Sequence, residues 1–239
     1  MGASVHIWTI ALDEEPGMVP ALIEMLSGDE RVRAARFRTT ELRVRFVVAH
    51  GALRTILSGY LGIAPGAVRF DTTESGKPYV PGAGLTFNLS RSEGLALCAV
   101  TVAGNVGVDV ERLRPVDDED AIVHRYFAPG EMRQYEAVRR PERTAAFFST
   151  WTRKEAFVKA VGSGLQLELS SFEVEVSPHA VCPRLTLAED QATWSLRSFS
   201  PRAQYVAAVA LDRDIEALEF FDWSSDALAT IASKPLSFQ

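Results

Sequence analysis

The chain of 239 residues is long enough for one large domain or two small ones, and its hydrophobic content of 47% is ordinary for a globular protein. Its net charge of −6 argues against general nucleic-acid binding. Cys98 and Cys182 lie far apart, which excludes a disulfide framework or a cysteine-rich zinc site. The sequence shows no apolar run that could span a bilayer and no signal peptide. We therefore expect a cytoplasmic protein that binds neither membranes nor nucleic acids.

The first half of the chain begins with an alternating pattern that is typical of a strand. Taken in order, the pattern predicts a strand over residues 5–12, helices over 16–26 and 46–61, and strands over 85–90, 95–102 and 106–111. Gly62 and Pro65 end the second helix. A turn-rich segment that contains Gly76-Lys77-Pro78 comes before the three strands.

The second half repeats this order. A long helix over residues 142–161 contains no internal proline or glycine, and strands are predicted over 172–176, 194–199 and 205–211. Each half therefore consists of one strand, a helical block and further strands. We predict an α+β fold of two similar halves, an N-terminal subdomain of residues 1–104 and a C-terminal subdomain of residues 105–239.

An arginine-rich segment stands out against the acidic background. Between Arg31 and Arg54 there are seven arginines and one acid, Glu41, so the local net charge is 7 − 1 = +6. A solvated helix face is the ordinary explanation for such a run. The alternative is a binding site for a polyanion. The arginines are Arg31, Arg33, Arg36, Arg38, Arg43, Arg45 and Arg54.

Two carboxylates lie close together in the segment Gly107-Val108-Asp109-Val110-Glu111. Residues two apart in a strand point to the same side, so Asp109 and Glu111 are neighbours while the two valines face the core. Adjacent carboxylates repel unless a proton or a cation joins them. Mg²⁺ takes oxygen ligands from one or two carboxylates and from substrate phosphate. A solvated sheet edge is the plainer explanation of the same pattern.

A second group lies on the long helix, in the segment WTRKEAFVK. Glu155 and Lys159 are four residues apart and share a face, as in an ordinary surface ion pair. Trp151 lies on that face one turn earlier and favours burial. The face is therefore expected to point into a cleft, where a carboxylate and an ammonium could serve a metal and a phosphate together.

These motifs, in this order, resemble the larger, surfactin-synthetase type of 4′-phosphopantetheinyl transferase. The strongest resemblance is in GVDVE and WTRKEAFVKAVGSG, about forty residues apart. SGKPYV, FNLSRS, the segment RYFAPGE and the arginine-bearing helix support it. The resemblance covers roughly residues 31–176. It implies two similar α/β subdomains in a pseudo-twofold arrangement, with coenzyme A between them.

The resemblance also implies roles for single residues. Asp109, Glu111 and Glu155 would hold Mg²⁺ on the pyrophosphate of coenzyme A, and Lys159 would contact the phosphate and steady the leaving group. The other coenzyme A contacts would come from Lys77, Pro78, Ser90, Arg91 and Asp109, with Arg45 and Arg33 at the 3′-phosphate. Arg91 departs from the family, since many members have a histidine there. A guanidinium can still contact phosphate and stays charged.

The implied reaction moves the 4′-phosphopantetheine arm from coenzyme A to a serine of an apo carrier protein and releases adenosine 3′,5′-bisphosphate. Acyl, polyketide and peptidyl carriers all present such a serine, and the resemblance does not choose among them. Glu155 and a metal-bound water are both candidates for the base, with the water favoured. We expect a monomer. A Mg²⁺-dependent phosphohydrolase and a non-catalytic coenzyme A-binding module are the rival interpretations.

Overall fold

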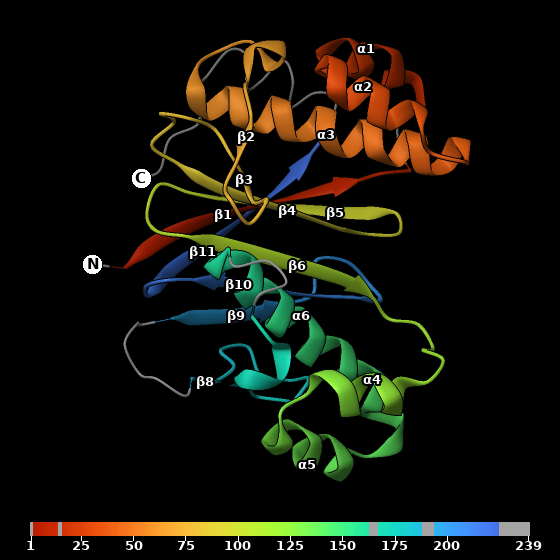
Figure 1. Ribbon diagram of the computed structural model, residues 1–239, viewed down its shortest axis with the longest axis vertical. Coiled ribbons are helices and arrows are strands. Elements are labelled where there is room, and N and C mark those ends of the chain that lie inside the picture. Colours follow the sequence, from red (N-terminus) through yellow and green to blue (C-terminus); the bar gives the residue numbers. More distant parts are fainter. Residues whose placement is uncertain (1, 14–15, 163–166, 188–193, 225–239) are drawn as a thin grey trace.

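The computed structural model describes residues 2–13, 16–162, 167–187 and 194–224. Four layers follow one another along its long axis (Figure 1). Helices of the N-terminal part cover one sheet, this sheet faces a second sheet, and helices of the C-terminal part cover the second sheet. The α+β class predicted from the sequence is confirmed.

The first sheet has the strand order β11-β1-β5-β4. It consists of β1 (Ala3–Ala11), β4 (Thr86–Ser92), β5 (Leu95–Thr101) and β11 (Ile215–Trp223). The strand β11 pairs in parallel with β1, and the other two pairings are antiparallel. A strand from the end of the described chain therefore completes the sheet of the N-terminal half. The sequence analysis contained no strand there.

The second sheet has the order β6-β10-β9 and is antiparallel throughout. Its strands are β6 (Val106–Arg112), β9 (Ser195–Phe199) and β10 (Tyr205–Leu211). Val108 and Val110 face Val5 and Leu97 of the first sheet in a fully buried cluster. The expected alternation in β6, with its valines inward, is confirmed, and it leaves Asp109 on the opposite side.

The helices of the N-terminal half are α1 (Val19–Met25), α2 (Gly28–Ala35) and α3 (Thr40–Leu61). The helix α3 begins six residues before the predicted start, because the Thr39 hydroxyl accepts from the amide of Leu42 and caps a polar first turn. The sequence analysis missed α2, which begins with a capping box between Ser27 and Glu30.

The helices of the C-terminal half are α4 (Glu119–Tyr126), α5 (Pro129–Ala137) and α6 (Arg143–Val161). The predicted long helix corresponds to α6, which packs across β6 and β10. Two small hairpins complete the described chain, β2 (Asp71–Thr72) with β3 (Pro78–Tyr79) and β7 (Glu173–Val174) with β8 (Leu185–Thr186). Of the helices described, none has both the length and the apolar character that crossing a membrane requires.

The division of the chain at Gly104 and the pseudo-twofold relation of its halves remain predictions. A subdomain that ended at residue 104 would lack β11, since that strand pairs with β1 along most of its length, from Ala3 to Ile10. The two halves are also joined by the apolar cluster between their sheets. We therefore expect the halves to depend on each other for stability.

Candidate functional site

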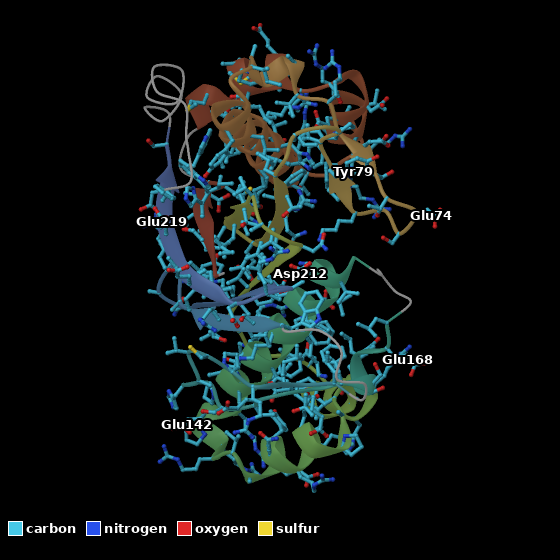
Figure 2. All side chains as sticks on the ribbon, turned by 90° about the vertical axis from the view of Figure 1, so that its left-hand side faces the viewer. Glu74, Tyr79, Glu142, Glu168, Asp212 and Glu219 are labelled. Carbon is cyan, nitrogen blue, oxygen red and sulfur yellow. The ribbon has the colours of Figure 1, made fainter. Side chains whose placement is uncertain are left out.

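A pocket of about 630 Å³ opens between the two halves. Residues 75–78 of the turn before β3 form one wall, and residues 167–170 form another. Glu155 and Lys159 of α6 also line it. Figure 2 shows Glu74 and Tyr79 in the upper half of the molecule and Glu168 in the lower half, all on the same side.

Asp109 lies at the centre of a buried polar contact next to this pocket. Its Oδ1 accepts from the Ser90 hydroxyl at 2.7 Å and from the Lys159 ammonium at 2.6 Å. Its Oδ2 is buried and has no hydrogen-bond partner among the described residues. The three side chains come from β6, β4 and α6, so the contact joins both sheets and the long helix.

A close approach between β6 and α6 brings these groups together. A Cβ atom on Gly107 would lie 2.1 Å from the carbonyl oxygen of Ala156 and 2.3 Å from the amide nitrogen of Ala160. No side chain fits at this position, so the glycine lets the helix pack directly on the strand. One consequence is that Lys159 reaches Asp109 from the face of α6 that also carries Glu155.

Two further side chains, Glu111 and Glu155, lie where burial disfavours the charged carboxylate. Burial raises the pKa of Glu111, and the Asp109 carboxylate adds to the effect, whereas a hydrogen bond from Ser92 lowers it. Burial also raises the pKa of Glu155, again with help from Asp109 and against Lys159. Both groups would be stabilised as carboxylates by an added positive charge.

These properties fit a hard divalent cation, although the candidate ligands do not form a complete coordination site. Among the described residues, no group of three or more acidic, histidine or cysteine side chains is arranged to hold a metal ion. The unsatisfied Oδ2 of Asp109 and the raised pKa values of its carboxylate neighbours are nevertheless what Mg²⁺ would relieve.

Lys77 enters the pocket from the opposite half. Its ammonium donates to the carbonyl oxygens of Val106 at 3.0 Å and Ala160 at 3.1 Å. Burial lowers its pKa to about 8, although Asp212 works in the other direction. Gly162, with a left-handed φ of 73°, ends α6 beneath it, and Pro78 lines the pocket beside it. The turn and the end of the helix are therefore held together by the lysine.

Arg33 and Arg91 both lie near the ring of Phe46, and neither is part of the pocket lining. Their guanidinium carbons lie 5.4 and 5.6 Å from its centroid. Burial lowers the pKa of Arg91, and the charge of Arg33 lowers it further. The structure records no ion pair with a carboxylate for either guanidinium among the described residues. Two like charges held in this way favour an anion as their partner.

Arg45, by contrast, is already engaged. Its guanidinium donates to both oxygens of Asp13 at 2.7 and 2.8 Å and forms an ion pair with Glu41 at 2.8 Å. The hydrogen bond from Arg45 lowers the pKa of Asp13. A phosphate would have to compete with two carboxylates for this side chain.

The structure thus brings Asp109, Ser90, Lys159 and Lys77 to the pocket or beside it. The residues at the pocket that the sequence analysis gave no role are Asn88, Arg125, Tyr126, Val158, Leu167, Glu168, Leu169 and Ser170. Asn88 accepts from the amide of Val108 and ties β4 to β6. The resemblance had included Asn88 and Arg125 within motifs, but the segment 167–170 carries no sequence signal. Ser163 and Gly164 of the glycine motif lie outside the described residues.

Comparisons with known proteins identify the family of the chain. The model of the 4′-phosphopantetheinyl transferase superfamily, ACPS, matches residues 105–210. A relative from Nostoc sp., 4′-phosphopantetheinyl transferase HetI, is 40% identical over 211 residues that cover 87% of each chain. The transferase Sfp of Bacillus subtilis is 31% identical over 155 residues, which cover 64% of this chain and 68% of that one.

Solved structures also resemble part of the chain, and one example shows the extent of the likeness. It is the holo-[acyl-carrier-protein] synthase of Thermotoga maritima, which is 25% identical with a TM-score of 0.35 and covers 46% of this chain and 63% of its own. The length and identity of the curated relatives are sufficient: this chain belongs to the 4′-phosphopantetheinyl transferase family and is an enzyme of that kind.

Proposed function

We propose that this enzyme transfers 4′-phosphopantetheine from coenzyme A to a serine hydroxyl of an apo carrier protein, in a reaction that depends on Mg²⁺. The observation that carries the proposal is the carboxylate of Asp109, which holds one oxygen on Lys159 and Ser90 and has the other buried without a partner. Glu155 and Lys159 connect this carboxylate to a pocket of about 630 Å³.

The reaction exchanges one phosphorus–oxygen bond for another. The serine oxygen forms a bond to the phosphorus of the phosphopantetheine arm, and the bond from that phosphorus to the bridging pyrophosphate oxygen breaks. Adenosine 3′,5′-bisphosphate leaves with the electron pair. Such transfers depend mainly on positioning and charge neutralisation. The candidates for the group that accepts the serine proton are Glu155 and a water molecule.

The side chains of the site then have distinct tasks. Asp109, Glu111 and Glu155 would hold Mg²⁺, which would neutralise charge on the pyrophosphate. Lys159 stabilises the negative charge that develops on the transferred phosphate, because its ammonium lines the pocket. Ser90 orients Asp109 through its hydrogen bond.

The donor also needs anchoring. Lys77 and Pro78 line the pocket wall, where we assign them to the phosphate and adenosine portion of coenzyme A. For the 3′-phosphate the paired guanidinium groups of Arg33 and Arg91 are better placed than Arg45, since Arg45 is held by two carboxylates. The arginine-rich segment then supplies an anion site, as its charge suggested.

Two kinds of partner follow from this function, coenzyme A as donor and an apo carrier protein as acceptor. The nucleophile comes from the carrier, so the enzyme needs none of its own. We further propose that the enzyme acts as a monomer in the cytoplasm and binds neither nucleic acid nor membranes.

Mass spectrometry of apo carrier proteins tests the proposal. The enzyme, coenzyme A and Mg²⁺ should add one phosphopantetheine group to a carrier, and a carrier with its serine changed to alanine should remain unmodified. A chelator should stop the reaction and added Mg²⁺ should restore it. Release of free phosphopantetheine without a carrier would instead identify a phosphohydrolase. Binding of coenzyme A without either reaction would identify a binding module.

A further inference from the structure

Lys154 and Glu131 form an ion pair that is completely buried. The ammonium of Lys154 lies 2.8 Å from Oε1 of Glu131, and both side chains have an exposed fraction of 0%. Neither residue lines the pocket, and the transfer chemistry uses neither of them. Taking two charges out of water is costly, and a buried pair is often no more stabilising than an apolar pair of the same shape. A structural role in stability alone therefore explains the pair poorly.

The other contacts of Lys154 point to what it does. Its ammonium also donates to the carbonyl oxygens of Leu169 at 2.7 Å and Phe172 at 2.8 Å. It lies 4.2 Å from the centroid of the Phe172 ring. All three donors of the ammonium are used, two of them on one short stretch of backbone. Lys154 thus fastens residues 169–172 to α6.

Glu131 fastens the same stretch from the other side. Its Oε2 accepts from the amide of Ala128 and its Oε1 from the amide of Val174, both at 2.7 Å. The first bond caps the start of α5, and the second holds β7. The pair therefore joins three pieces of backbone: the start of α5, the middle of α6 and residues 169–174.

One of these pieces is a wall of the pocket. Residues 167–170 line it, and Glu155, the neighbour of Lys154 on α6, lines it as well. Adjacent residues of a helix point in different directions. Lys154 can therefore hold the wall from behind while Glu155 faces the cavity.

We propose that the Lys154–Glu131 pair is a positioning device that holds residues 167–170 in the conformation that receives coenzyme A. The inference rests on the proposed function, because it takes coenzyme A as the ligand of this pocket. The pair acts through backbone that it holds and touches no reacting atom. Its loss should weaken donor binding more than it slows the transfer step.

The same helix supplies a matched control. Arg153 is also fully buried, and it donates to Ser198 and to the carbonyl oxygens of Glu175 and Ala180. None of these partners lines the pocket. Arg153→Met therefore removes a buried cation from α6 and loosens backbone at residues 175 and 180, which do not line the pocket.

The test compares Arg153→Met with the double variant Glu131→Gln/Lys154→Met, which leaves no buried charge without its partner. Calorimetric titration with coenzyme A gives Kd, and steady-state kinetics gives KM and kcat. For the double variant we expect Kd and KM for coenzyme A to rise about tenfold, the size of one lost charge-assisted hydrogen bond, with kcat changed less. For Arg153→Met we expect a lower Tm and an unchanged Kd.

Two results would overturn the inference. One is a double variant that binds coenzyme A as tightly as the wild type, and the other is an equal loss of affinity in both variants, which would indicate general loosening. A wild type that binds no coenzyme A would refute the proposed function itself, so the two failures are distinguishable.

Hydrogen exchange on the wild-type protein gives a test that needs no variant to fold. The Ser171 amide donates to the carbonyl oxygen of Glu168 within the wall. If the ion pair holds the wall, this amide is protected in the free enzyme and coenzyme A adds little protection. An amide that exchanges freely until coenzyme A is added would show that the ligand orders the wall, and the inference would be wrong.

Discussion

The ammonium of Lys159 lies 2.6 Å from Oδ1 of Asp109, and through this contact α6 is joined to β6 at the mouth of the pocket. Lys159 neutralises part of the charge on Asp109 but contacts only one of its oxygens. The second oxygen remains buried and unsatisfied within the described part of the chain. The arrangement leaves the second oxygen of Asp109 able to bind a cation.

Asp109→Asn should abolish transfer. The amide keeps the size of the side chain and its hydrogen bond with Ser90, but it removes the charge that would bind Mg²⁺. The rate of carrier modification measures the loss, and a thermal melt checks that the fold persists. Ser92→Ala is a suitable comparison, since it removes the hydrogen bond to Glu111 and the one accepted from the Arg112 amide but no charge, and it should reduce the rate far less. Transfer at the wild-type rate by Asp109→Asn would exclude this residue as a metal ligand.

Lys159→Ala should lower the rate of transfer by roughly a hundredfold, as loss of one donor to developing charge does in other enzymes. Single-turnover kinetics with saturating coenzyme A isolates this step from binding. Since Lys159 also contacts Asp109, titration with Mg²⁺ should accompany the measurement. An unchanged rate would leave Lys159 with a structural role as the partner of Asp109.

At acidic pH, the rate of transfer should begin to fall at a pH above the ordinary pKa range of glutamate. Burial raises the pKa of Glu155 and of Glu111 from about 4.5, so each carboxyl is protonated at a higher pH than usual. Protonation removes a ligand, and the apparent affinity for Mg²⁺ should therefore fall as the pH is lowered through these raised values. Excess Mg²⁺ should move the acid limb to lower pH, because the metal binds the deprotonated form. An acid limb independent of Mg²⁺ would contradict this assignment.

At alkaline pH, the dependence of kcat/KM on pH should report the deprotonation of Lys77. Burial lowers its pKa to about 8, so the ammonium loses its proton as the pH rises through that value. We expect kcat/KM for coenzyme A to fall above about pH 8, since this parameter reports groups of the free enzyme. In Lys77→Met the value should be lower throughout, and this alkaline limb should disappear. If the limb persists unchanged in the variant, Lys77 is not the titrating group.

The sequence predicted the strand and helix positions of the candidate site residues better than it predicted the walls of the pocket. The alternation in β6 placed Asp109 and Glu111 correctly, because strand geometry depends on local spacing alone. The spacing on α6 placed Glu155 and Lys159 on one face, whereas the contact of Lys159 with Asp109 arises from the close approach of helix and strand at Gly107. Such a contact between distant segments cannot be derived from helical periodicity.

Long-range pairing explains why β11 was missed, whereas α2 has a local signal in its Ser27–Glu30 capping box. The strand β11 is stabilised by β1, which lies more than two hundred residues away in sequence. The sequence analysis predicted no strand at β11. The helix α2 is short, and the sequence analysis used its arginines only to count the local net charge. The wall at residues 167–170 is held by Lys154 through the carbonyl oxygen of Leu169. Helical periodicity alone does not distinguish this lysine from one on the surface.

The last prediction concerns the 3′-phosphate, which dephospho-coenzyme A lacks. A charge-assisted arginine contact to it contributes about 1.5–3 kcal/mol, or roughly ten- to a hundredfold in affinity. Arg91→Ala and Arg33→Ala should therefore weaken coenzyme A binding by this factor and leave dephospho-coenzyme A binding nearly unchanged. Arg45→Ala should change the ratio of the two affinities less, because Asp13 and Glu41 already hold its guanidinium.

Titration calorimetry with both ligands, on the wild type and each variant, closes a thermodynamic cycle for every arginine. Arg202→Ala is the control for general electrostatic attraction, since this arginine pairs with Asp222 and does not line the pocket. Equal weakening of both ligands by Arg91→Ala would mean that Arg91 attracts coenzyme A through charge alone. If only Arg45→Ala abolished the preference, a phosphate would have to displace Asp13, and the anion site would belong to Arg45 instead of to the guanidinium pair over Phe46.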